Sequence, residues 1–470
     1  MARSDGVGDF THFEDIMKTL LADPKYSGVV FIPIVCFNSG GKESNYVRIG
    51  EQMRTLGIPF FYGKNEDHLR LSKDKILQRL LGEADQAIVI SYDTGIFNQY
   101  KPYLKPGIPI KSIGEHERAI LAMTRDNIEG HIQYRLGLGP SSDGIKIRDT
   151  TPMTPNDAWS TIKRDDPSVA TQLLTCTSSA NFESFYNNYL ITPAYFNRSM
   201  DFISYLFLLG ISHSLSQNIV VYLSGTTLDL TRISPEWITH CFNNTSIQQI
   251  EIYRPNNKLP TIIPGNPEGV RSIKILSGFY LANSSFDAIY WLSKIAGVSG
   301  DNTLERCISM NILPFYWSTN HDNKIQTLFA LRRITQLPEL SMSPEARASF
   351  NIFFDPDEFK SCDGMMWHAD SDEPREQYNR YKKRNHYFDL DLPKMIESWP
   401  IITDYLRKNN NFYNQLERIV LENLPLEAQP ALSIQKPHVR SRHGDQVFFN
   451  SSKQSLGEKI DHEHVITKKS

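Results

Sequence analysis

The stretch that decides the fold is Ala296-Gly297-Val298-Ser299-Gly300-Asp301-Asn302-Thr303-Leu304-Glu305-Arg306, which continues to Met310 and then to Leu313. Its apolar beginning predicts a short buried strand, and its small polar residues predict a turn. Residues 303–310 predict a helix, and the next apolar run, 313–317, predicts a second strand. A strand, turn, helix and strand in this order form the repeating unit of a parallel sheet covered by helices.

The same alternation extends outward in both directions. The first third of the chain carries apolar runs separated by amphipathic stretches, at Val29–Phe37, Ile58–Tyr62, Ala87–Tyr92 and Ile108–Ile113. A second series of apolar runs precedes the quoted stretch, at Ile219–Leu223, Ile250–Tyr253 and Ile273–Leu276. Because strands buried on both faces read as continuous apolar runs, we predict an α/β protein with two Rossmann-like parallel-sheet domains.

Changes in composition suggest where these domains end. We predict an N-terminal domain over residues 1–165 and a second α/β domain over 166–335, joined by a polar linker within residues 140–167. Residues 336–430 read as a helical region. The remaining residues, 431–470, are polar and lack periodicity, which predicts a disordered tail.

Composition excludes several classes of protein. The chain has 470 residues, 40% of them hydrophobic, and a formal net charge of −3, so it lacks the basic field of a nucleic-acid-binding protein. Its five cysteines are scattered and never form a C-x-x-C pair, which argues against a disulfide framework or a zinc cage. The start lacks the apolar core of a signal peptide, and no apolar run is long enough to span a bilayer. We therefore expect a cytoplasmic protein without a membrane span, and secretion by a non-classical route stays open.

Two hydroxyl-rich turns follow predicted strands and suggest an anion site. Ser224-Gly225 follows Ile219–Leu223, and Ser299-Gly300 opens the helix at Thr303. Glycine lets backbone N–H groups approach a phosphate, and the positive end of a helix favours it. The alternatives are an ordinary turn at Ser224 and a capped helix at residue 300, with Asp301 or Asn302 as the cap and Glu305 in the first turn.

The continuation past Pro314, with His321 and Asp322 in a polar turn, favours the anion site. Over residues 219–323 the chain resembles the donor-binding half of GT-B glycosyltransferases, particularly the bacterial N-acetylglucosaminyltransferase that makes lipid II. That family shows a strand-exit Gly/Ser loop, a Ser-Gly turn opening a helix that contains Thr and Glu, and then a polar turn with His and an acid. One residue of slippage separates the two patterns between Gly300 and Pro314.

The resemblance implies a nucleotide diphosphate sugar as donor and assigns roles to individual residues. Phosphate would be contacted by Ser224 and Gly225. The pyrophosphate would be held by Ser299, Gly300 and Thr303, beside Asp301 and Asn302. The ribose would be bound by Glu305, and sugar hydroxyls would be held by His321 or Asp322. The base would lie near Tyr253 and Phe279–Leu281. Arg254 would offset charge on the leaving group, although a solvated surface arginine explains it equally well.

The first domain would bind the acceptor, which the sequence does not identify. Glu43, in the turn Ser39–Asn45, is placed to act as the base of an inverting transfer, and Asp93 and Glu115 also follow predicted strands. Each of the three also fits an ordinary surface charge. The implied transfer needs no metal and no cofactor beyond the donor.

Two rival interpretations remain. Ser39-Gly40-Gly41-Lys42-Glu43-Ser44 resembles the PP-loop of ATP pyrophosphatases, which adenylate their substrates, although that pattern has Asp where this chain has Glu43. The other rival is a non-catalytic nucleotide-sugar-binding protein. The D-x-D triplets Asp370-Ser371-Asp372 and Asp389-Leu390-Asp391 read as solvated loops, because two carboxylates do not complete an oxygen-ligand metal site.

Overall fold

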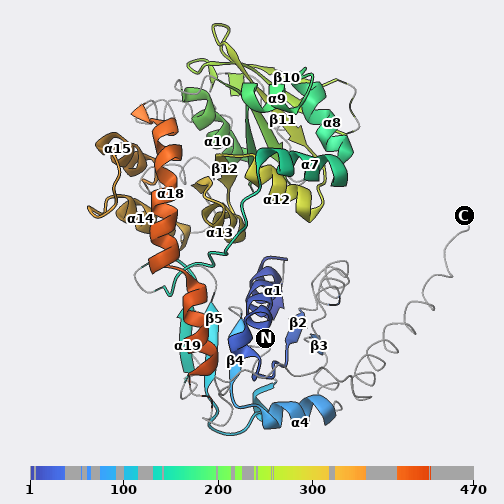
Figure 1. Cartoon of the computed structure of the whole chain (residues 1–470), viewed down its shortest axis with the longest axis vertical. Coiled ribbons are helices and arrows are strands. Elements are labelled where there is room, and N and C mark those ends of the chain that lie inside the picture. The colour runs from blue at the N-terminus through green and yellow to red at the C-terminus, as the bar shows by residue number, and fades with distance from the viewer. Residues whose placement is uncertain are drawn as a thin grey trace, which may run out of the picture.

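Figure 1 shows a computed structural model of the chain, in which two α/β lobes are joined at one side. The structure describes residues 2–4, 7–37, 54, 61–64, 75–90, 100–114, 131–139, 142–196, 199–212, 217–224, 238–239, 242–255, 257, 259–316, 323–355, 389–422 and 424.

The first lobe is built on a six-stranded parallel sheet in the order β3-β2-β1-β4-β5-β6. This is the strand order of a Rossmann fold. Strands β2 and β3 are added on one side of β1, and β4, β5 and β6 are added on its other side, so the order reverses between β1 and β4. The strands are β1 (Ala2–Ser4), β2 (Ile34–Phe37), β3 (Phe61–Lys64), β4 (Ala87–Ile90), β5 (Ile110–Gly114) and β6 (His131–Arg135).

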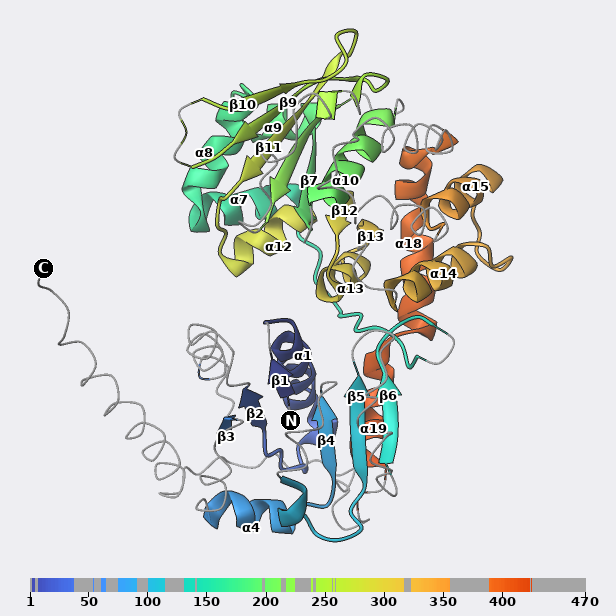
Figure 2. The ribbon, with the colours of Figure 1, turned by 180° about the vertical axis from the view of Figure 1, so that it is seen from behind.

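Helices from both ends of the chain cover this sheet. The N-terminal elements are α1 (Val7–Ala22), the 3-10 turns η1 (Pro24–Tyr26) and η2 (Lys101–Tyr103), and α4 (Lys75–Glu83). A 3-10 turn, η5 (Phe412–Gln415), and α19 (Leu416–Leu421) come from the C-terminal part and share one apolar cluster with α1. Figure 2 shows α19 lying along β5 and β6. The Lys111 Nζ fixes α19 by donating to the carbonyls of Ile419 and Glu422, both at 2.6 Å.

The second lobe is built on a seven-stranded sheet in the order β10-β9-β11-β8-β7-β12-β13. All neighbours are parallel except the edge strand β10, which pairs antiparallel with β9. The strands are β7 (Tyr189–Tyr195), β8 (Asn218–Leu223), β9 (Ile247–Tyr253), β10 (Thr261–Pro264), β11 (Arg271–Ser277), β12 (Ile295–Val298) and β13 (Leu313–Tyr316).

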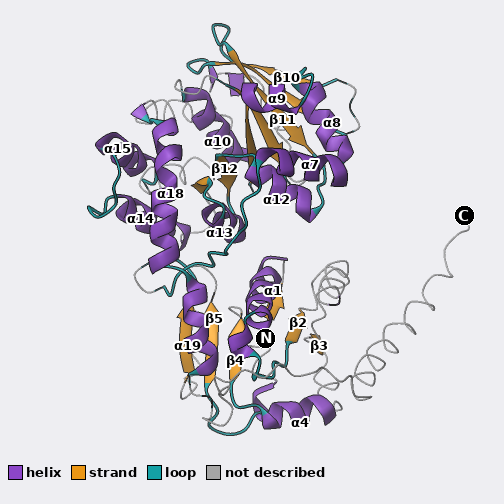
Figure 3. Ribbon diagram, viewed as in Figure 1, coloured by secondary structure: helices purple, strands orange, loops and turns teal. Residues whose placement is uncertain are grey.

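Alternate residues of these strands enter two separate cores, one on each face of the sheet. Ile219, Val221 and Leu223 belong to one cluster, and Val220 and Tyr222 belong to the other. The face that carries Ile219 is covered by α10 (Ser199–Ile211), α14 (Asn323–Thr335), α15 (Pro344–Phe353) and α18 (Leu392–Asn409). The face that carries Val220 is covered by α7 (Pro155–Asp165), α8 (Pro167–Cys176), α9 (Phe182–Asn188) and α12 (Asn283–Trp291). Helix α13 (Asp301–Ser309) follows β12 at the side of the lobe that faces α1 (Figure 3).

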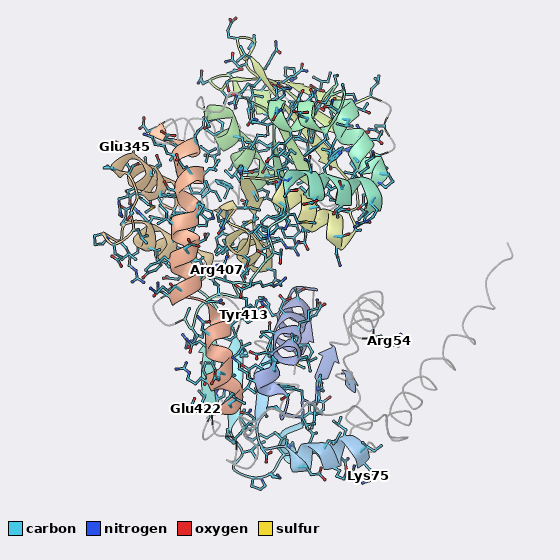
Figure 4. The ribbon with its side chains drawn as sticks, viewed as in Figure 1. Arg54, Lys75, Glu345, Arg407, Tyr413 and Glu422 are labelled. Carbon is cyan, nitrogen blue, oxygen red and sulfur yellow. The ribbon has the colours of Figure 1, made fainter. Side chains whose placement is uncertain are left out.

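Within the described ranges, the chain crosses between the lobes near Ile145 and again near Asn411, and these two crossings are hydrogen-bonded to each other. The Ile145 N–H donates to the Asn410 carbonyl at 2.9 Å, and the Phe412 N–H donates to the Ile145 carbonyl at 2.8 Å. The Asn411 side chain bonds both backbone groups of Ile147. Arg407 and Tyr413 mark this junction in Figure 4, and the Arg407 guanidinium donates to the carbonyls of Arg148 and Ser309.

The α/β class with two parallel sheets is therefore confirmed, and several local predictions need correction. Residues 155–165, placed in the linker, form α7. The predicted strand at 29–37 is β2, and the first strand of the sheet is β1. The predicted helix over residues 411–424 divides into η5 and α19. Among the described residues, no helix is long and apolar enough to cross a membrane.

Candidate functional site

The candidate site lies where the second sheet reverses its strand order. From β7 the chain goes to β8 on one side, whereas β12 lies against the other side of β7. In open α/β sheets, ligands bind beyond the carboxyl ends of the strands at such a switch point. Helix α13 begins directly beyond the carboxyl end of β12, so its N-terminus occupies this position.

The first turn of α13 is shaped by Gly300, its N-cap. Because this residue has no side chain, the cap contributes no side-chain hydrogen bond to the N–H groups that begin the helix. The Thr303 hydroxyl donates to the Gly300 carbonyl at 2.6 Å, and Asp301 accepts from the Tyr316 hydroxyl at 2.5 Å. Residues 300–303 are all partly exposed. The helix end is therefore accessible in part, and its dipole favours an anion there, although Asp301 already brings one carboxylate to the first turn.

The two predicted turns converge on the end of β7. The Ser224 N–H donates to the Ala194 carbonyl, and the Ser299 N–H donates to the Tyr195 carbonyl, both at 2.9 Å. Since β8 and β12 are the two neighbours of β7, these turns lie about 10 Å apart at one edge of the sheet. The structure thus brings Ser224, Ser299, Gly300 and Thr303 together, although the two serine N–H groups are used within the protein. A β-carbon on Gly300 would lie 3.3 Å from the Tyr195 ring, so this tyrosine borders the helix end.

Glu305 is placed differently from the ribose contact predicted for it. Its side chain is buried, and its Oε1 accepts from the Lys146 N–H at 3.0 Å. Its Oε2 lies 3.2 Å from the Lys146 Nζ. Both carboxylate oxygens are therefore engaged inside the protein, and this arrangement does not fit a carboxylate that reaches a bound ribose.

Lys146 is the centre of an ion cluster that joins the lobes. Its fully buried Nζ also contacts Asp15 of α1 at 3.1 Å and the Asn302 side chain at 3.3 Å. The Arg148 guanidinium pairs with the same Asp15 carboxylate. Burial alone would lower the pKa of the Lys146 ammonium, but Glu305 and Asp15 raise that pKa above its ordinary value. The first turns of α13 are thus tied through one charged lysine to α1 of the other lobe.

The residues predicted around the base lie farther along the same edge. Tyr253 ends β9 and Arg254 follows it, and this strand is four strand positions, or about 19 Å, from β12. The Tyr253 hydroxyl donates to Glu251 at 2.5 Å, and Lys274 lies over its ring. Phe279 and Leu281 pack against the core on the α7 and α12 face. The structure does not bring these residues to the end of α13.

Several predicted residues lie outside the described part of the chain. They are the candidate bases Glu43, Asp93 and Glu115, the phosphate contact Gly225, the sugar contacts His321 and Asp322, and the PP-loop candidate at residues 39–44. Their roles remain predictions.

The described residues contain no group of three or more His, Cys, Asp or Glu side chains placed to hold a metal ion. Of the two D-x-D triplets, residues 370–372 lie outside the described part of the chain. Asp391 of the other triplet caps α18, because its carboxylate accepts from the Lys394 N–H at 3.1 Å.

The sequence patterns did not predict three residues of this region, which are Lys146, Asp15 and Tyr195. Lys146 and Glu305 are 159 positions apart, so no local pattern pairs them. A usable signal was the charged pair Lys146 and Arg148 beside buried isoleucines, since a charge flanked by core residues requires a partner.

Among known proteins, similarity to this chain was found with solved structures and not with protein families or curated sequences. No protein-family model matches the chain, and no curated protein sequence matches it. A UDP-GlcNAc 2-epimerase from Neisseria meningitidis, bound to UDP-GlcNAc, is 10% identical with a TM-score of 0.37, over 87% of this chain and 98% of its own. The N-terminal domain of a trehalose-6-phosphate phosphatase from Candida albicans is 9% identical with a TM-score of 0.33, over 89% and 94% of the two chains.

A third structure, described as trehalose-6-phosphate from E. coli bound with UDP-2-fluoro glucose, is 9% identical with a TM-score of 0.26. It is matched over 90% of this chain and 78% of its own. The fold assignment rests on the chain's own strand orders. By these it consists of two Rossmann-like lobes with a C-terminal helical part, the GT-B-like arrangement that its sequence predicts.

Proposed function

We propose that this protein is a glycosyltransferase that uses a nucleotide diphosphate sugar and binds its diphosphate at the N-terminus of α13. The observation that carries this proposal is the position of that helix end. It lies at the switch point of the second sheet, it is capped by a glycine, and α13 contacts α1 of the first lobe. A helix end in this position suits an anion held between two lobes.

In the proposed reaction, a nucleoside diphosphate leaves the sugar at this site. Negative charge develops on the diphosphate as the sugar leaves, and preorganised N–H groups and a helix dipole stabilise that charge. No metal is needed for this step in the proposed reaction. An acceptor on the first lobe would attack from the opposite side, with Glu43, Asp93 or Glu115 as the proposed base of an inverting transfer.

A thermal-shift panel tests the proposal directly. The panel contains UDP-, GDP-, ADP- and TDP-sugars, with ATP and inorganic diphosphate beside them. One nucleotide sugar at 100 times its dissociation constant should add about 2.7 kcal/mol of stability. This is a rise of about 3 °C in Tm if the whole chain unfolds as one unit, and about 6 °C if the second lobe unfolds by itself. The absence of a shift with every nucleotide sugar would exclude the proposal, and a shift with ATP alone would favour the adenylating enzyme.

Release of nucleoside diphosphate separates an enzyme from a binding protein. The sugar donor that shifts Tm is incubated with the protein, and the free nucleoside diphosphate is measured over time. Steady release supports transfer or its hydrolytic side reaction. Binding without release, with candidate acceptors present, would favour a non-catalytic nucleotide-sugar-binding protein.

A further inference from the structure

The segment that follows the first crossing between the lobes is fastened to α13. The Lys146 N–H donates to the Glu305 Oε1 at 3.0 Å, and the Arg148 N–H donates to the Ser309 hydroxyl at 3.0 Å. The Thr150 hydroxyl donates to the Ser309 carbonyl, also at 3.0 Å. Because Glu305 and Ser309 lie one helical turn apart on α13, this segment runs along one side of the helix and belongs to the second lobe.

Asp15 of α1 pairs with both cations of this segment. Its Oδ2 lies 3.1 Å from the Lys146 Nζ, and the Arg148 guanidinium pairs with the same oxygen. The Asp15 side chain is only 6% exposed, so the contact lies inside the junction between α1 and α13, which face each other in Figure 2. Asp15 is therefore an acidic residue of the first lobe that holds a segment fixed to the second.

The Lys146 ammonium gives this junction a defined geometry. An ammonium has three N–H donors, and within the described residues three oxygens surround this one. They are the Asp15 Oδ2 at 3.1 Å, the Glu305 Oε2 at 3.2 Å and the Asn302 Oδ1 at 3.3 Å. The ammonium is fully buried, so a shift of α1 relative to α13 would take an oxygen away from a group that water does not reach.

We infer that Asp15 is a positioning residue that holds the first lobe over the N-terminus of α13. It acts through Lys146, whose ammonium contacts the Asn302 side chain in the first turn of that helix. α1 follows β1 at the switch point of the first sheet, so the place of α1 sets the place of the edge where an acceptor would bind. The consequence for transfer rests on the proposed function, whereas the consequence for the lobes does not.

Hydrogen exchange in the ligand-free protein tests the position of the lobes. Asp15→Asn removes the charge and keeps the shape of the side chain. Glu14→Gln is the matched control, because Glu14 pairs with Lys18 inside α1 at 2.7 Å. We expect Asp15→Asn to speed amide exchange at least about tenfold in residues 11–20 and 301–309, and Glu14→Gln to change it at most about twofold. Equal exchange in the two variants would overturn the inference, whether or not the protein binds a nucleotide sugar.

Arg148→Gln keeps the inference testable if Asp15→Asn does not fold. The Arg148 side chain is 45% exposed, and its replacement leaves Lys146 paired with Asp15. We expect exchange in the same two segments to rise about threefold. Unchanged exchange in Arg148→Gln, together with an unfolded Asp15→Asn, would show that the carboxylate serves stability alone.

The proposed transfer supplies a second readout, at a temperature where the variants are folded. For the nucleotide sugar that gives the largest thermal shift, Asp15→Asn should keep Kd within about threefold and slow the release of nucleoside diphosphate at least about tenfold. An unchanged rate, or an equal loss of affinity and rate, would contradict a positioning role. If the unaltered protein binds no nucleotide sugar, the proposed function is wrong, and the exchange data still decide the role of Asp15.

Discussion

Lys146 is the buried centre of the ion cluster that joins the two lobes. Its ammonium is fully buried between Glu305 and Asp15, and it connects the segment between the lobes to α13 and α1. A buried pair contributes little net stability compared with apolar residues of the same size. Removal of one partner, however, leaves a buried charge without compensation and costs about 3–5 kcal/mol.

Replacement of Lys146 by methionine should therefore destabilise the protein strongly. We expect Lys146→Met to lower the free energy of unfolding by about 3–5 kcal/mol in urea denaturation, because Glu305 loses its charged partner. Lys163→Met, on the exposed side of α7, is the matched control and should change stability by at most about 0.5 kcal/mol. The double substitution Lys146→Met with Glu305→Leu should recover part of the loss, because the buried Glu305 charge is removed while the Lys146 N–H loses its acceptor. Equal effects of Lys146→Met and Lys163→Met would contradict the role given to this cluster.

Glu305 also shows what a sequence can and cannot assign at this scale. Its position near the start of a helix was predictable, because Gly300 to Glu305 has the pattern of a helix start. Its partner was not predictable, since the choice between a ribose and a lysine depends on a residue 159 positions away. An acidic residue near a helix start fits a cap, an ion pair and a ligand contact equally well.

At the scale of elements, β12 depends on a glycine for its place in the sheet. A β-carbon on Gly297 would lie 2.5 Å from the Phe196 ring and 2.7 Å from the Tyr205 ring. These rings belong to the core on the α10 side, where they also pack against Phe315 of β13. The strand that leads into α13 is therefore positioned by aromatic side chains that occupy the space of a missing side chain.

Gly297→Ala should displace this strand. We expect a loss of about 1–3 kcal/mol in unfolding free energy, because two buried rings must shift to admit one methyl group. Gly82→Ala in α4 is the control, since its nearest neighbouring atom, the Tyr103 carbonyl oxygen, would lie 3.8 Å away. Alanine there should be neutral or stabilise the helix by up to about 1 kcal/mol. If Gly297→Ala is as stable as the unaltered protein, the packing described for β12 is wrong.

Elements with a strong apolar pattern were predictable, and short or interrupted ones were not. The strands β8 and β13 begin and end within about one residue of their predicted bounds. β7 was missed, although it is central in its sheet, because Pro193 interrupts its apolar run and usually excludes a residue from a central strand. β1 was missed because three residues form no detectable pattern.

At the scale of the whole molecule, two Rossmann-like lobes present their switch points to each other. α1 follows β1 at the switch point of the first sheet, α13 follows β12 at that of the second, and the two helices are in contact. The paired crossings at Ile145 and Asn411 hold the lobes together at one side. This arrangement was predictable from the two series of α/β units, whereas the return of α19 to the first lobe required the structure.

The central claim is that the N-terminus of α13 binds the diphosphate of a nucleotide sugar. Thr303→Asp tests it, because a second carboxylate in the first turn, beside that of Asp301, increases the repulsion of a bound anion while the helix dipole tolerates it. Thr303→Asn is the matched neutral control, and both variants should unfold within about 1 kcal/mol of the unaltered protein.

The decisive measurement is the dissociation constant, by calorimetric titration, of the nucleotide sugar that gives the largest thermal shift. The account predicts that Thr303→Asp weakens binding at least about tenfold, equivalent to about 1.4 kcal/mol, and that Thr303→Asn stays within about threefold of the unaltered protein. Equal affinity in the Asp and Asn variants would contradict the claim, because an added negative charge at the helix end would then have no effect on the ligand.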